Sequence, residues 1–160
     1  MKQLLSFAIM VILIAAVFSG CGRLPDEQLL DKGKKYEQDE RFEDAVQCYL
    51  KLEEEYPDSP LRAEALYQAG RVYTYGLKEY DTAIELFKRA ADEFTGTETG
   101  AQCQFMVGFI YANNEVDTAK ARIAYQDFVN TYPDHDLADD VQWELKNLGK
   151  DINEIIHFEN

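Results

Sequence analysis

Small, aromatic and apolar residues recur along this chain in one pattern that is repeated three times between residues 33 and 133. In each copy a glycine is followed three residues later by a tyrosine. Further on, an alanine is followed by an aromatic residue at +4, an apolar residue at +7 and, in two copies, a proline at +12. The three copies are Gly33, Tyr36, Ala45, Tyr49, Leu52 and Pro57; Gly70, Tyr73, Ala83, Phe87, Ala90 and Thr95; and Gly108, Tyr111, Ala121, Tyr125, Phe128 and Pro133.

The spacing inside each copy predicts two helices. Residues three apart share one face of a helix, and residues at i, i+4 and i+7 form a buried stripe. A helical pair cannot bury its apolar face alone, so neighbouring pairs must stack. The pattern therefore predicts an all-α fold, with helices at about 27–39, 42–56, 60–75, 79–94, 99–113, 117–131 and 137–148.

The flanking residues suggest where some of these helices begin. Ser59 followed by Pro60 is typical of an N-cap and a first helical residue, and Asp136 is a candidate N-cap for the last helix. That helix should cover the third copy as a cap, and we expect Trp143 to pack within it. Its apolar stripe is Leu137, Val141, Leu145 and Leu148.

The N-terminus resembles a bacterial lipoprotein leader. Lys2 precedes an uncharged apolar stretch from Leu4 to Phe18, which as a helix spans about 22 Å and is short for a membrane of about 30 Å. Residues 18–21, Phe-Ser-Gly-Cys, resemble a lipobox, although Phe18 stands where leucine is usual. The resemblance implies a cleaved signal peptide at 1–20, a lipid (palmitate among its acyl chains) on Cys21 and a linker to residue 25. The alternative is an uncleaved signal anchor with an incidental cysteine.

Charge and cysteine placement narrow the function classes. The formal net charge of −14 opposes binding to nucleic acid or to anionic lipid surfaces.

Cys48 and Cys103 fall a whole repeat apart, too far for a disulfide, so we predict two buried thiols. Asp134-His135-Asp136 suggests either a metal site or a turn, and we interpret it as a turn. We predict no metal and no cofactor.

The repeated landmarks resemble the tetratricopeptide repeat, with its Gly-x-x-Tyr, Ala-x-x-x-Phe and proline positions. The resemblance covers about 26–133, with a period longer than usual and Thr95 replacing one proline. It implies an α-solenoid of three helical hairpins (about 26–59, 60–97 and 98–135) plus a cap at 136–149. The whole domain would span 26–150, and 151–160 would form an apolar tail. The long period resembles that of BamD-like outer-membrane lipoproteins and of tetratricopeptide proteins associated with the Tol-Pal system.

The same resemblance implies a concave groove lined by the first helix of each hairpin. The corresponding positions are Leu30, Lys34, Glu37, Glu64, Tyr67, Arg71, Thr74, Tyr75, Gln102, Phe105, Phe109 and Asn113. Aromatic anchors with a few charges suit a peptide or helix of a partner. Lys34 and Arg71 are the expected polar contacts, because basic residues are scarce in this chain. The alternative for Tyr67, Phe105 and Phe109 is packing between neighbouring helices.

Together these features predict a non-catalytic scaffold, lipid-anchored in the cell envelope, facing the periplasm from the outer membrane. Its partner would be another envelope protein, with no nucleic acid and no small-molecule substrate. The resemblance suggests a role in outer-membrane protein assembly. The alternatives are an adaptor of the Tol-Pal type, an accessory subunit of an envelope hydrolase, or self-association through the open edge of the solenoid.

Overall fold

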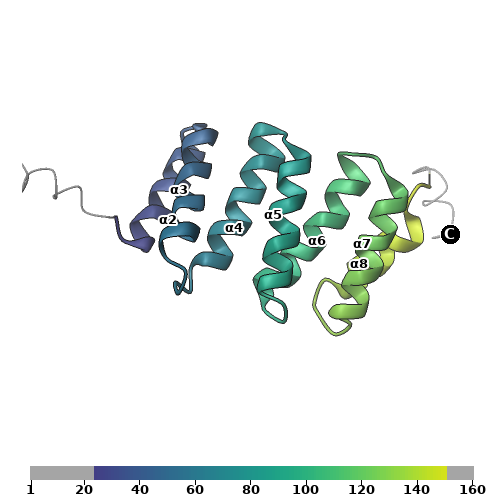
Figure 1. Cartoon of the computed structure of the whole chain (residues 1–160). Helices are drawn as coiled ribbons and strands as arrows, with labels where there is room; N and C mark the ends of the chain where they lie inside the picture. The colour runs from purple at the N-terminus through teal and green to yellow at the C-terminus, as the bar shows by residue number, and fades with distance from the viewer. Residues whose placement is uncertain (1–23, 151–160) are drawn as a thin grey trace, which may run out of the picture.

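The computed structural model describes residues 24–150, which contain seven α-helices, one π-helical segment and no strand (Figure 1). In chain order these are α2 (Asp26–Gln38), α3 (Phe42–Glu55), α4 (Arg62–Arg71), the π-helix η1 (Val72–Leu77), α5 (Tyr80–Glu93), α6 (Glu98–Asn113), α7 (Thr118–Thr131) and α8 (Ala138–Asn147). The predicted leader, Cys21 and the tail at 151–160 lie outside the described residues. Within residues 24–150 no helix has the length and hydrophobicity needed to span a bilayer.

The helices form three antiparallel hairpins that stack side by side in one row, with α8 packed on α7 (Figure 1). The hairpins are α2–α3, α4–α5 with η1 between them, and α6–α7. Three buried clusters run along the row, centred on the interfaces of α2 to α4, α4 to α6, and α6 to α8. The predicted all-α solenoid of three hairpins and a final helix is confirmed.

Each repeated glycine lies directly against an aromatic ring of its own hairpin. A Cβ atom placed on any of the three glycines would overlap that ring. The pairs are Gly33 with Tyr49, Gly70 with Phe87, and Gly108 with Tyr125. All three rings are fully buried. The landmarks of the sequence pattern are therefore the two sides of one close contact, made once in every hairpin.

The first helix of the second hairpin ends differently from the prediction. The α-helical bonding stops at Arg71, and the chain continues as the wider η1 before Lys78 closes the turn with a left-handed φ of 58°. The backbone N–H of Glu79 then donates to the carbonyl of Tyr73 at 2.9 Å. Gly76 packs against the ring of Phe42 from the preceding hairpin, where a Cβ would lie 2.6 Å from Cδ1. This contact between hairpins accompanies the wider turn.

Ser59 and Pro60 do not begin a helix as predicted, because α4 starts at Arg62. Pro60 lies in the preceding turn. The Ser59 hydroxyl accepts from the N–H of Leu61 at 3.1 Å and donates to Oδ2 of Asp26 at 2.5 Å. This last bond lowers the pKa of the Asp26 carboxyl. Ser59 thus links the turn to the start of α2. The local sequence around Ser59 does not predict this contact.

Asp136 is not the N-cap of the last helix, which begins at Ala138. The N-cap position is held by Leu137, and no side chain caps the helix. The imidazole of His135 instead orders the turn before α8, since its Nδ1 accepts from the N–H of Leu137 at 3.1 Å. The predicted packing of α8 on the third hairpin is confirmed, with Val141 fully buried. Trp143 does not pack as predicted: it lies on the outer side of α8 and is 49% exposed.

Candidate functional site

The positions predicted to contact a partner lie on the first helices of the three hairpins. We call this surface the first-helix face. It consists of Lys34, Glu37, Glu64, Tyr67, Arg71, Tyr75, Gln102, Phe105 and Phe109. Helices α4 and α6 pack against each other directly, and ion pairs join α2 to α4. The face is therefore one surface that runs across the hairpins.

The two basic residues of this face are paired within the chain. Nζ of Lys34 lies 2.7 Å from Oε1 of Glu64, and Nη2 of Arg71 lies 3.9 Å from Oε1 of Glu37. Glu37 also accepts from the hydroxyl of Tyr49 at 3.2 Å. Burial, and next the Glu37 charge, raise the pKa of Tyr49. The Lys34–Glu64 pair is tight and the Arg71–Glu37 pair is loose, so Arg71 is the more available cation.

The aromatic residues of the face each have one side packed and one side exposed. Tyr67 is half-buried with its ring centroid 5.9 Å from that of Phe87, and burial raises its pKa. Phe105 contacts Phe109 at 6.1 Å and Tyr125 at 6.2 Å between ring centroids. The alternative in which these rings pack between helices therefore holds, and it leaves part of each ring accessible.

Two positions assigned to the groove by resemblance do not face it. Leu30 is buried in the core between α2 and α4. Thr74 is 2% exposed, and its hydroxyl donates to the Gly70 carbonyl at 2.8 Å within the helix. Its neighbour Tyr75 is 55% exposed, so η1 adds an aromatic side chain at the end of the face.

Gln102 of the first-helix face, and Asn113, which the resemblance also assigned to the groove, each form a hydrogen bond along α6. Nε2 of Gln102 donates to Oε1 of Glu98 at 2.9 Å, and Nδ2 of Asn113 donates to the Phe109 carbonyl at 3.0 Å. Both side chains are held by their own helix, so each can be released toward a partner by a rotamer change alone.

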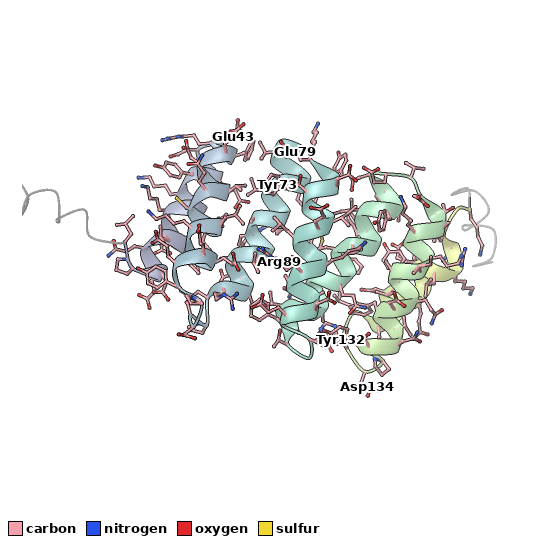
Figure 2. All side chains as sticks on the ribbon, viewed as in Figure 1. Glu43, Tyr73, Glu79, Arg89, Tyr132 and Asp134 are labelled. Atoms are coloured by element: carbon pink, nitrogen blue, oxygen red, sulfur yellow. The ribbon has the colours of Figure 1, made fainter. Side chains whose placement is uncertain are left out.

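A network of ion pairs joins α3 of the first hairpin to α4 and α5 of the second. A carboxylate oxygen of Glu53 on α3 lies 3.2 Å from Nη2 of Arg62, and its other oxygen lies 3.5 Å from Nη2 of Arg89. Figure 2 labels Arg89 on α5. Nη1 of Arg62 also lies 2.7 Å from Oε1 of Glu93. Burial alone would lower the pKa of Arg62, but the bonds to Glu93 and Glu53 outweigh it and raise the pKa.

A hollow that the sequence analysis missed lies between α5 and α7, with α6 as its floor. Its volume is about 760 Å³, and Val107, Tyr111, Lys120 and Ile123 are among its lining residues. Val107 and Tyr111 project from the side of α6 opposite to Phe105 and Phe109, so the hollow and the first-helix face lie on opposite sides. One feature of the sequence could have indicated this hollow: Ile123 is apolar yet falls outside the buried stripe of α7.

Neither internal cysteine forms a disulfide, and both are buried, as predicted. Burial raises the pKa of the Cys103 thiol to about 12 and also raises that of Cys48. Thiols in this state are poor nucleophiles and poor metal ligands. Among residues 24–150 no group of three histidine, cysteine or acidic side chains is arranged to hold a metal ion.

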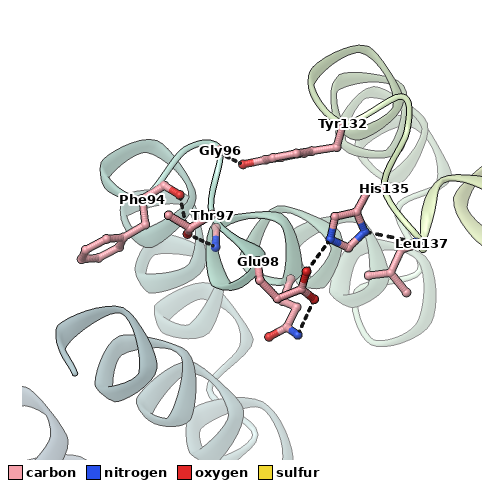
Figure 3. A network of polar contacts seen from close by, with 9 residues as sticks. Phe94, Gly96, Thr97, Glu98, Tyr132, His135 and Leu137 are labelled. Atoms are coloured by element: carbon pink, nitrogen blue, oxygen red, sulfur yellow. Dashed lines mark hydrogen bonds and ion pairs between the residues drawn. The ribbon is translucent and has the colours of Figure 1, made fainter. Parts of the chain in front are cut away.

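His135 makes structural contacts at the turn between α7 and α8, as the turn interpretation expected. Its Nδ1 accepts from Leu137, so the ring proton lies on Nε2, which donates to Oε2 of Glu98 at 3.0 Å (Figure 3). Nearby, the N–H of Gly96 donates to the Tyr132 hydroxyl at 3.2 Å. These bonds tie the ends of the third hairpin to the loop before it.

Comparison with known families gives the repeat its name. The model of the tetratricopeptide repeat matches residues 64–97 and 102–135, which cover the second and third hairpins. No curated protein matches the chain. The unmatched first hairpin has the same glycine–aromatic contact as the other two. The second and third hairpins are thus similar to tetratricopeptide repeats, and residues 24–150 fold as a TPR-type α-solenoid, a fold that typically serves as a non-catalytic module for protein–protein interaction.

Proposed function

We propose that this protein is a membrane-anchored scaffold that holds a segment of another envelope protein on its first-helix face. The observation that carries the proposal is the partial exposure of Tyr67, Phe105 and Phe109 along neighbouring first helices. Aromatic rings that are fixed on one side and accessible on the other are typical anchors of protein interfaces, because little side-chain entropy is lost on binding.

The charges of the face suit a segment with an acidic group near its aromatic or aliphatic anchors. At 3.9 Å the pair between Arg71 and Glu37 is at the limit of an ion pair, and the guanidinium also bonds Gln68 at 2.8 Å. A carboxylate of a partner can replace Glu37 at small cost, since partly exposed ion pairs contribute only about 0–1 kcal/mol. The resident acidic residues would repel a segment that carried acids throughout.

The lipid anchor is the second part of the proposal and rests on residues 18–21, Phe-Ser-Gly-Cys. Residue 26 begins α2, so a chain anchored at Cys21 would hold the solenoid within about 17 Å of the membrane surface. Gly22 at the following position favours the outer membrane over inner-membrane retention. Assembly of outer-membrane proteins is the proposed setting. A Tol-Pal type adaptor and an accessory subunit of an envelope hydrolase are the alternatives.

The binding face is tested by cross-linked pull-down from native membranes, read by mass spectrometry. Wild type is compared with an Arg71→Glu/Tyr75→Ala variant, and an Arg89→Glu variant on the second helices is the matched control. We expect a specific envelope protein to be recovered with wild type and control and lost with the face variant. Equal loss with Arg89→Glu, or no specific protein with wild type, would argue against this face. The recovered protein distinguishes barrel assembly, Tol-Pal and hydrolase settings.

The anchor is tested separately with a Cys21→Ser variant. We expect the wild-type chain to fractionate with membranes and to carry an acyl mass on an N-terminal Cys21, and the variant to lose both. An unmodified Cys21 with residues 1–20 still attached would support the signal-anchor alternative. Because the two experiments change different residues, the anchor and the binding face can fail independently.

A further inference from the structure

The hollow between α5 and α7 is an open groove with an apolar middle. Val107 forms the floor, while Ala91 and Ala124 form the walls. Ile123 stands at its edge and is 64% exposed, which is unusual for a large aliphatic side chain. Such a surface gains free energy when another apolar side chain covers it, by about 25 cal/mol for each Å² removed from water.

One end of this groove is basic. The ammonium groups of Lys88 and Lys120 lie 5.5 and 5.3 Å from the ring centroid of Tyr111, and Nζ of Lys88 donates to its hydroxyl at 3.3 Å. Lys120 also pairs with Asp117 at 3.2 Å. Lys88 forms no ion pair with any carboxylate in the described part of the chain.

The other end of the groove is acidic and polar. Asp92 follows Lys88 by one turn of α5, and Asp127 follows Lys120 by two turns of α7. Since α5 and α7 are both second helices of their hairpins, they run in the same direction and their basic ends coincide. The groove is therefore basic, then apolar, then acidic along its length.

We propose that residues 151–160 of this same chain occupy the groove. The described chain leaves the fold beside its basic end. A Cβ on Gly149 would lie 3.6 Å from Cγ2 of Thr118, the first residue of α7 and two residues before Lys120. Residues two apart lie on opposite sides of a helix. Five extended residues span about 17 Å, enough to pass half-way around a helix about 10 Å across.

The order of residues in the tail matches the order of charges in the groove. Glu154 comes first, the pair Ile155 and Ile156 follows, and His157 comes next. From Glu154 to His157 an extended chain spans about 10 Å, and Lys120 to Asp127 along α7 also spans about 10 Å. The register therefore places Glu154 at the lysines, the isoleucines over the apolar middle and His157 at the acidic end.

This docking leaves the first-helix face free, because the groove lies on the opposite side of the solenoid. It also covers Ile123 without a second protein. The proposal is therefore independent of the proposed partner site, and either can be wrong without the other.

The test is photo-cross-linking within the full chain. Benzoylphenylalanine replaces Ile123 in one variant and Trp143, the exposed residue on α8, in another. After irradiation, peptides are mapped by mass spectrometry and chains are sized on a denaturing gel. We expect position 123 to cross-link to residues 152–158 within one chain. Cross-links from position 143 alone, cross-links only between two chains, or none to the tail would each overturn the proposal.

Charge reversal gives the matched control. A Lys88→Glu/Lys120→Glu variant should lower the cross-link yield from position 123 by roughly fivefold, as loss of partly exposed ion pairs predicts. Lys51→Glu, which changes an exposed lysine on α3 remote from the groove, should leave the yield unchanged. Adding Glu154→Lys to the double variant should restore the yield. Equal yields in all variants would overturn the predicted register.

Discussion

A methyl group on Gly70 would lie 2.7 Å from Cε1 of Phe87, well inside the contact distance of two carbon atoms. The first and second helices of this hairpin are therefore closer than any side chain at position 70 would allow. The same relationship holds in the hairpins before and after it. The distance between the two helices of each hairpin is thus set by a glycine and an aromatic ring.

Replacing Gly70 with alanine should destabilise the protein by about 1–3 kcal/mol, because the new methyl group forces the helices or the Phe87 ring apart. The higher helix propensity of alanine offsets about 1 kcal/mol at most. Urea unfolding followed by circular dichroism measures the change. In a double-mutant cycle with Phe87→Leu the two changes should couple favourably. Simple additivity would show that the overlap is relieved elsewhere.

His135→Ala should cost about 1–2 kcal/mol of stability, because it removes the acceptor for the Leu137 N–H and the bond to Glu98. The ring also packs edge-on against Phe128 with centroids 5.8 Å apart. Asp136→Ala, which would be the damaging change if Asp136 were the N-cap, should change stability by less than about 0.5 kcal/mol. Thermal unfolding of the two variants decides which residue stabilises the turn before α8, and the reverse ranking would reject the role of His135.

Stability should fall as the pH rises above about 9. Burial raises the pKa of Cys103 from 9.0 to about 12, so the unfolded chain loses this proton more readily than the folded chain. Below pH 9 the thiol is neutral in both states, and its full contribution to the free energy of unfolding is present. Between pH 9 and 12 this contribution is lost at about 1.4 kcal/mol per pH unit. The pKa values of Tyr49 and Tyr125 are raised too, which steepens the loss above pH 10. The measurement is urea unfolding at several pH values from 7 to 11. The free energy of unfolding should fall less steeply with pH in Cys103→Ala than in the wild type.

Two ion pairs should differ sharply in their contribution to stability. Lys34→Ala breaks a pair whose side chains are 41% and 39% exposed, and should cost less than about 1 kcal/mol. Arg62→Ala should cost about 2–3 kcal/mol, because Arg62 is mostly buried and bonds both Glu53 and Glu93. Chemical unfolding measures both. A larger loss of stability in Lys34→Ala than in Arg62→Ala would contradict this ranking. It would also indicate that the charged residues of the first-helix face serve the stability of the fold and not partner binding.

The hairpins could be predicted from the sequence because their determinants are local and repeated. The glycine, alanine and aromatic landmarks lie within one hairpin, so their spacing along the chain is enough to predict the contact between its two helices. The π-helical segment could not be predicted in this way. Its Gly76 packs against Phe42, which belongs to the preceding hairpin. The same is true of Ser59, whose partner Asp26 lies on another helix.

Prediction of the candidate site was weaker, because exposure depends on several helices at once. Of the positions that the resemblance assigned to the groove, Tyr67, Phe105 and Phe109 are partly exposed, but Leu30 and Thr74 are buried. The groove between α5 and α7 was missed because three helices build it. Its floor comes from the side of α6 that carries no landmark besides Tyr111.

The one-row stacking of the helices also has a kinetic consequence. Helices in the described part of the chain pack mainly on their immediate neighbours in sequence, and the larger of the remaining contacts join α3 to η1 and α4 to α6. Contact order is therefore low, and little chain entropy is lost before native contacts form. We expect folding to start in any one hairpin and to spread to its neighbours, on a timescale of microseconds to milliseconds.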